Sequence, residues 1–123
     1  MFGKDLFIAG LKQFDYVPEN KEGNLIEFSY LIRGGRFKDT KVSVRIDVPT
    51  DFGVTCPSGL NISPQLIPLN PNGTGNDRAA ESPFGSDWEY LSRPFIDQAE
   101  GWNRTTKDVK AYLRHIKRIL ETL

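Results

Sequence analysis

Two runs of alternating residues constrain the fold of this chain more than any other feature of its sequence. Residues 25–33 and 41–48 place an apolar side chain at every second position, and these are Ile26, Phe28, Tyr30, Ile32, Val42, Val44, Ile46 and Val48. Such alternation is typical of a strand with one buried face, because successive side chains of a strand point to opposite sides. Gly34 and Gly35 stand between the runs and supply turn chemistry. The pattern predicts an antiparallel hairpin.

The intervening positions of the hairpin share the opposite face of the predicted sheet. They are Leu25, Glu27, Ser29, Leu31, Ser43, Arg45 and Asp47. If helices cover only the apolar face, this mixed apolar and charged face stays exposed, and such a surface suits non-covalent docking of a protein. These seven residues are therefore our candidate partner-binding residues. An ordinary solvated sheet face explains the same pattern equally well.

Helices are expected at both ends of the chain. Asp5 is placed to cap a short first helix, whose apolar stripe is Phe7, Leu11 and Phe14. Thr105, followed by Asp108, resembles a capping box that starts a last helix. The apolar face of that helix comprises Val109, Tyr112, Leu113, Ile116, Ile119, Leu120 and Leu123. Helix, antiparallel strands, long loop and helix in this order predict one α+β domain over residues 1–123.

The middle of the chain is rich in turn-forming residues. Five prolines fall within residues 49–71, which fits loops and one short irregular strand over residues 60–69. Residues 70–87 are expected to form a long loop, and residues 88–102 an irregular aromatic-rich stretch. The aromatic side chains of that stretch either anchor it to the core or form a binding surface. They are Trp88, Tyr90, Phe95 and Trp102.

Composition excludes several classes of function. Sixteen basic and sixteen acidic side chains cancel, which argues against general nucleic-acid binding. No apolar run reaches the roughly 18 residues of a membrane span. The first residues do not read as a signal peptide, so the expected compartment is the cytoplasm. One cysteine, Cys56, and one histidine, His115, cannot make a typical structural zinc site, so we expect no metal and no cofactor.

Neither of these two residues is in a setting that favours catalysis. Residues 54–59 around Cys56 contain no charged side chain that would lower the pKa of the thiol. His115 has Arg114 and Lys117 as neighbours and no carboxylate one helical turn away, so we expect a surface histidine. No serine stands in a nucleophile elbow, and residues 73–75 lack the lysine of a phosphate loop. The sequence therefore assigns no catalytic residue.

Three segments resemble the ubiquitin-conjugating (UBC) family, especially its divergent bacterial members. Residues 48–57 look like the end of a strand followed by the proline turn of that family. Leu69-Asn70-Pro71-Asn72 is similar to its His-Pro-Asn motif, with Asn70 in place of the histidine. Trp102 and the threonines after it look like the residues that introduce the late helix. The resemblance implies a UBC-like α+β fold, with an N-terminal helix, a meander of about four strands and a C-terminal helix packed on the sheet.

The chain departs from this family where the catalytic cysteine should stand. The corresponding stretch, residues 78–81, contains Ala79 and Ala80 and no cysteine, and Cys56 precedes the motif. By the resemblance, Asn70, Pro71, Asn72, Ala79 and Ala80 mark a vestigial active-site region. The chain is then similar to inactive conjugating-enzyme variants, which bind a ubiquitin-like protein or another conjugation-pathway protein without forming a thioester. Two alternatives are an active conjugating enzyme that uses Cys56 or a hydroxyl nucleophile, and an unrelated small interaction domain.

Overall fold

The computed structural model describes residues 3–52, 54–55, 57, 59–66, 80–85, 87–91 and 106–121 of the chain. The helices are α1 (Gly3–Gln13) and α3 (Val109–Glu121). The strands are β1 (Glu19–Asn20), β2 (Leu25–Leu31), β3 (Lys41–Asp47), β4 (Leu60–Ser63), β5 (Ala80–Glu81) and β6 (Glu89–Leu91). An N-terminal helix, an antiparallel sheet and a C-terminal helix confirm the α+β class.

The strands form one antiparallel sheet in the order β1-β2-β3-β4-β6-β5. The first four strands are neighbours in chain order, as a meander requires. Two predictions were wrong beyond this point, because β5 lies in the expected loop at 70–87 and β6 lies in the expected irregular stretch at 88–102. Both strands are too short to display an alternating pattern in the sequence, and they enter the sheet through the pairing of β6 with β4 and β5. Residues 67–79 lie outside the described part of the chain.

The predicted hairpin is confirmed with its faces as expected. β2 and β3 pair over seven residues, from Leu25 opposite Asp47 to Leu31 opposite Lys41. The eight apolar residues of the alternating runs are all buried, and Tyr30, at 7% exposed, is the least so. The alternation of apolar and polar residues therefore specified the register of the two strands, since a slip of one residue would turn every apolar side chain to water.

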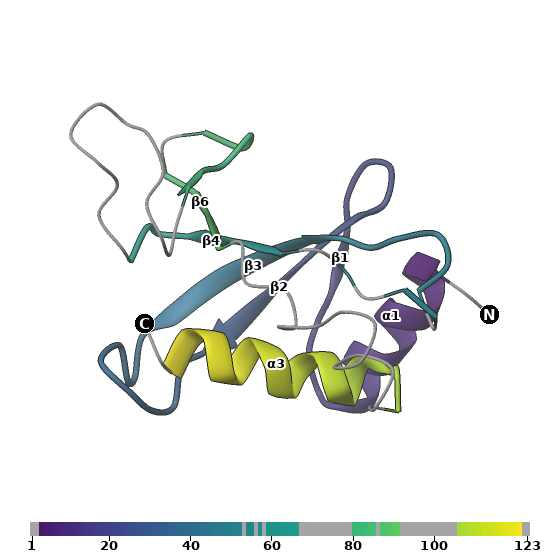
Figure 1. Ribbon diagram of the computed structural model, residues 1–123, viewed down its shortest axis with the longest axis horizontal. Coiled ribbons are helices and arrows are strands. Elements are labelled where there is room, and N and C mark those ends of the chain that lie inside the picture. Colours follow the sequence, from purple (N-terminus) through teal and green to yellow (C-terminus); the bar gives the residue numbers. More distant parts are fainter. Residues whose placement is uncertain are drawn as a thin grey trace.

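Both helices pack against the apolar face of this sheet. Figure 1 shows α3 running along one side of the sheet, with α1 beside its N-terminal end. The Phe7 ring on α1 lies 4.9 Å from the ring of Phe52 and 5.9 Å from the ring of Tyr112 on α3, both edge to face. These rings and the apolar residues of the strands belong to one hydrophobic core. The opposite face of the sheet has no helix on it in the described part of the chain (Figure 1).

The first helix differs from its prediction at both ends. It begins at Gly3, whose amide donates to the Phe52 carbonyl at 3.3 Å, so Asp5 lies inside the first turn and does not cap the helix. At the other end Asp15 has a φ of 68°, and this left-handed residue turns the chain out of the helix. Phe14 therefore leaves the helical phase of the stripe and is 39% exposed, contrary to its expected core position.

The last helix is confirmed, but its capping residue is Asp108. The Asp108 Oδ1 atom accepts a hydrogen bond from the Ala111 amide at 2.9 Å, three residues on, which is the geometry of an N-cap. Asp108 was expected at the third position of a capping box that starts at Thr105, and Thr105 lies outside the described residues. The buried face comprises Val109, Ala111, Tyr112, His115, Ile116, Ile119 and Leu120.

Candidate functional site

The candidate binding residues lie side by side on the outward face of the hairpin. Strand pairing places Leu25 opposite Asp47, Glu27 opposite Arg45 and Ser29 opposite Ser43. Ser29, Leu31 and Asp47 are exposed, and Leu25 and Ser43 are half-buried. Their arrangement follows from the two-residue period of the strands, because the alternate residues are held in the core. We call this set of seven residues the outward face.

Arg45 and Glu27, which face each other at the centre of this surface, form an ion pair. The Arg45 Nε and Nη2 atoms donate to the Glu27 Oε1 atom at 3.0 and 2.6 Å. Only 21% of the Arg45 side chain and 19% of the Glu27 side chain are exposed. Charge-assisted hydrogen bonds at this low exposure are stronger than those of a surface pair. The two charges that would steer a partner are thus engaged with each other.

Two aromatic rings from the segment before β6 cover Arg45. Its Cζ atom lies 4.5 Å from the ring centroids of both Phe84 and Trp88. Each cation–π contact contributes about 0.5–1 kcal/mol at a partly exposed position. Trp88 therefore anchors its segment to the molecule. Anchoring was one of the two alternatives predicted for the aromatic side chains, but the contact lies on the outward face and not in the core.

Hydrogen bonds hold this covering segment, residues 82–85 and 87–88, on the sheet. The Ser82 hydroxyl donates to Asn61 Oδ1 on β4 at 2.8 Å and accepts from the Phe84 amide at 3.2 Å. The Asn61 side-chain amide donates to the Arg45 carbonyl at 3.4 Å. Asn61 is only 6% exposed. The row of Glu27 and Arg45 under Phe84 and Trp88 therefore divides the outward face, with Leu25 and Asp47 on one side and Ser29, Leu31 and Ser43 on the other. We call these five residues the open part.

Sequence reasoning missed the contribution of Asn61, Ser82, Phe84 and Trp88 to this surface. Arg45 lies 16 residues from Asn61 and 39 from Phe84, and nothing in the local pattern relates these positions. The one usable signal was an arginine on the outward side of a strand together with aromatic residues later in the chain. Arginine stacks on aromatic faces more readily than lysine does.

Most of the proposed vestigial active-site region lies outside the described residues. This holds for Asn70, Pro71, Asn72 and Ala79, and also for Cys56. Ala80 is described in its backbone, where it forms β5 with Glu81 and pairs with Tyr90. Ala80 therefore lies in an edge strand of the sheet.

His115 was expected on the surface, and this prediction was wrong. It is only 6% exposed on the buried side of α3, where its ring lies 5.8 Å from the ring of Tyr112. The helical period explains the position, because residue 115 follows Ala111 and Tyr112 by four and three residues on the same face. The charged neighbours Arg114 and Lys117 point to water from adjacent faces.

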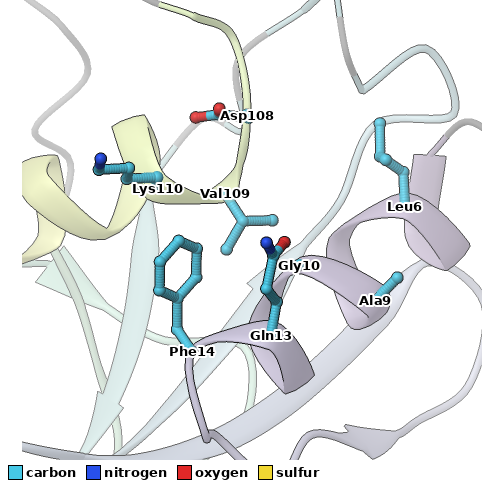
Figure 2. A pocket seen from close by; sticks show the side chains of 8 residues that line it. All are labelled: Leu6, Ala9, Gly10, Gln13, Phe14, Asp108, Val109 and Lys110. Atoms are coloured by element: carbon cyan, nitrogen blue, oxygen red, sulfur yellow. The ribbon is translucent and has the colours of Figure 1, made fainter.

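A cleft of about 470 Å³ lies beside the contact between α1 and the start of α3. Figure 2 shows Val109 directed at α1 near Gly10, with Phe14 and Gln13 beside it. The charged residues of the cleft wall are Asp108 and Lys110. Because Asp108 already caps α3, the cleft presents no pair of groups set up for acid–base or nucleophilic chemistry.

Two further observations concern the described residues only. Among them, no group of three or more histidine, cysteine, aspartate or glutamate side chains is placed to hold a metal ion. No helix in the same part of the chain has the length and apolar character that crossing a membrane requires.

Comparison with known proteins yields no relative. No protein-family profile, no curated protein and no solved structure matches the chain significantly.

Proposed function

We propose that this chain is a non-catalytic binding protein with a UBC-like fold, which docks a ubiquitin-like modifier or another conjugation-pathway protein on its outward face. Two features support the proposal. The chain order of helix, four-strand meander and late helix is the order on which the resemblance rests. Both helices pack on one face of the sheet, which leaves the other face for a partner.

The observation that carries the proposal is the open part of the outward face. Ser29, Leu31 and Ser43 are neighbours by strand register, and Leu31 is a large apolar side chain that is 41% exposed. Leu25 and Asp47 face each other on the far side of the Glu27–Arg45 row. A partly apolar patch with a polar surround is the composition of many non-obligate interfaces. The Arg45–Glu27 pair lies between the two groups of the open part and supports the covering segment.

A docking experiment should therefore leave Arg45 unchanged, because replacing it would release the segment of Phe84 and Trp88. We choose Ser43→Arg with Asp47→Arg, which adds two long cations to the open part on β3. The matched control is Gln13→Arg, which adds the same side chain to an exposed position of α1. Titration of the chain with the ubiquitin-like modifier encoded in the same genome, followed by calorimetry, measures the dissociation constant.

We expect the double variant to weaken binding at least tenfold, corresponding to about 1.4 kcal/mol, and the control to bind as the unchanged chain does. Equal affinity of the double variant and the control would exclude the outward face as the docking surface.

The non-catalytic part of the proposal has its own test. The chain is incubated with the activating enzyme, nucleotide and modifier, and the products are separated on gels with and without a thiol reductant. We expect no reductant-sensitive conjugate. A conjugate that disappears in Cys56→Ala would show that the chain forms a thioester.

A further inference from the structure

The edge of β2 is open beyond β1. The Ile32 amide donates to the Thr40 carbonyl at 2.9 Å, and the Ile32 carbonyl accepts from the Asp39 amide at 2.7 Å. Both backbone groups of Ile32 thus point toward β3. Because these groups alternate from side to side along an antiparallel strand, those of Ser29 and Leu31 point the other way, to the free edge.

No strand of the described chain occupies that edge. β1 lies opposite Glu27 and Ile26 only, and the chain before it leaves β2 at Pro18, which has no amide hydrogen. Within the described ranges, Ser29 and Leu31 have no backbone partner on this side. Two amide donors and two carbonyl acceptors therefore lie in a row, spaced as a further strand would need them.

A groove of about 580 Å³ runs beside this edge. Its walls are β2 with its extension and the residues between α1 and β1. Phe14, Val17 and Leu31, which line it, are 39%, 83% and 41% exposed. Among the described residues only one other large apolar side chain, Val54, is comparably exposed. Among the described residues, the exposed large apolar side chains are thus concentrated at a strand edge with unpaired backbone groups.

The groove also has a surplus of positive charge. Arg33 and Lys41 line it, and in the described part of the chain neither has a carboxylate within 4.0 Å. Asp15 is the carboxylate among the lining residues. Lys41 stands directly opposite Leu31 in the β2–β3 pair, so one cation adjoins the apolar contact. A ligand with acidic groups next to apolar ones complements this arrangement.

We propose that an extended acidic peptide segment of a partner protein binds here as an added strand on β2, with its backbone paired to Ser29 and Leu31. Its apolar side chains contact Phe14, Val17 and Leu31, while its carboxylates face Arg33 and Lys41. Backbone pairing provides affinity and the flanking side chains provide selectivity, as in other cases of strand addition. This site goes beyond the proposed docking on the outward face, because it depends on backbone groups at the sheet edge.

The probe is a seven-residue peptide blocked at both ends, with threonine at the even positions and valine and glutamate in turn at the odd positions, so that both kinds of side chain lie on one face of the added strand. The matched control peptide has lysine in place of glutamate. Titration of the ¹⁵N-labelled chain follows the amide signals of Ser29 and Leu31. We expect the glutamate peptide to shift these two signals and to bind at least tenfold more tightly than the lysine peptide. A version of the glutamate peptide is methylated on those alternate backbone nitrogens that would pair with Ser29 and Leu31. This version should lose binding, because methylation removes the amide hydrogens.

Substitutions in the chain test the same site. Ser29→Pro removes the amide that points to the edge and leaves the ladder to β3 intact, because proline is tolerated at edge positions. Ser29→Thr keeps the amide and serves as its control. We expect Ser29→Pro to lose peptide binding and Ser29→Thr to retain it. If Ser29→Pro does not fold, Arg33→Gln with Lys41→Gln provides the test, with an expected loss of at least tenfold in affinity.

Three results would overturn the proposal. The first is equal binding of the glutamate and lysine peptides. The second is an absence of shifts at Ser29 and Leu31 with the glutamate peptide at up to about 1 mM. The third is self-association through this edge that the peptide does not displace, since the occupant would then be a second copy of the chain. Ser43→Arg with Asp47→Arg should leave peptide binding unchanged, so failure here is distinguishable from failure of docking on the outward face.

Discussion

Arg45 illustrates how one residue can change its role with its surroundings. On a bare strand it is a surface cation available to a partner. In this molecule its guanidinium is hydrogen-bonded to Glu27 and covered by Phe84 and Trp88. Its planar fork serves both contacts at once, because it donates in its plane and stacks through its faces. Arg45 therefore holds a loop on the sheet.

Tyr30 allows a test of burial at the scale of a single residue. Burial raises the pKa of its phenol to about 12, the charges of Tyr16 and Glu121 add to the rise, and Arg33 opposes it. In the unfolded chain the phenol ionises near pH 10, so between pH 10 and 12 the unfolded state binds fewer protons than the native state. The stabilisation is thus complete below pH 10 and is lost as the pH rises to about 12.

We expect the free energy of unfolding to fall by on the order of 1–2 kcal/mol across this window, since one pKa unit is worth about 1.4 kcal/mol and solvent screens part of it. Urea denaturation at several pH values measures the free energy of unfolding. Subtracting the phenolate absorbance of Tyr30→Phe from that of the unchanged chain reports the ionisation of Tyr30. The decline should be shallower in Tyr30→Phe. A phenol at position 30 that ionises near pH 10 would contradict the effect of burial.

At the scale of elements, the two helices approach each other through a glycine. A Cβ atom added at Gly10 on α1 would lie 2.6 Å from the Val109 Cβ atom on α3 and would overlap its Cγ2 atom as well. Glycine is about 1 kcal/mol less favourable than alanine in a helix, but its missing Cβ atom permits this close packing. The first turn of α3, which Asp108 caps, is thereby fitted to the middle of α1.

Gly10→Ala should therefore destabilise the protein, although alanine is the better helix former. Overpacking of this kind destabilises by about 1–3 kcal/mol, which exceeds the gain in propensity. The double variant with Val109→Gly removes the Val109 Cβ atom together with its methyl groups, so we expect a favourable coupling of at least about 1 kcal/mol in a double-mutant cycle measured by urea denaturation. A more stable Gly10→Ala variant would mean that the helices move apart freely.

For the whole molecule, stability is expected to be greatest at the middle of the sheet. β3 pairs with β2 over seven residues and with β4 on its other side, whereas β1 and β5 are two-residue strands at the two edges. Backbone hydrogen bonds between long buried strands break only when the core unfolds, whereas those of short edge strands break in local opening. The same asymmetry leaves the β2 edge accessible beyond β1.

Native-state hydrogen exchange measures this gradient directly. We expect the amides of Val44 and Ile46 on β3 to exchange at least about 100-fold more slowly than those of Asn20 on β1 and Glu81 on β5. The slowest amides should give the same free energy as urea denaturation, which serves as the internal control. Exchange of β5 as slow as that of β3 would show that the β5–β6 pair belongs to the stable core.

The sequence alone determined the hairpin, its two faces and the amphipathic last helix. These features depend on side-chain periods of two and 3.6 residues, which neighbouring positions display by themselves. Tertiary structure alone decided that Phe84 and Trp88 cover Arg45, that β5 and β6 join the sheet, and that the β2 edge stays open. Such contacts join residues far apart in the chain, and which of them form depends on how the packed elements place their edges and loops.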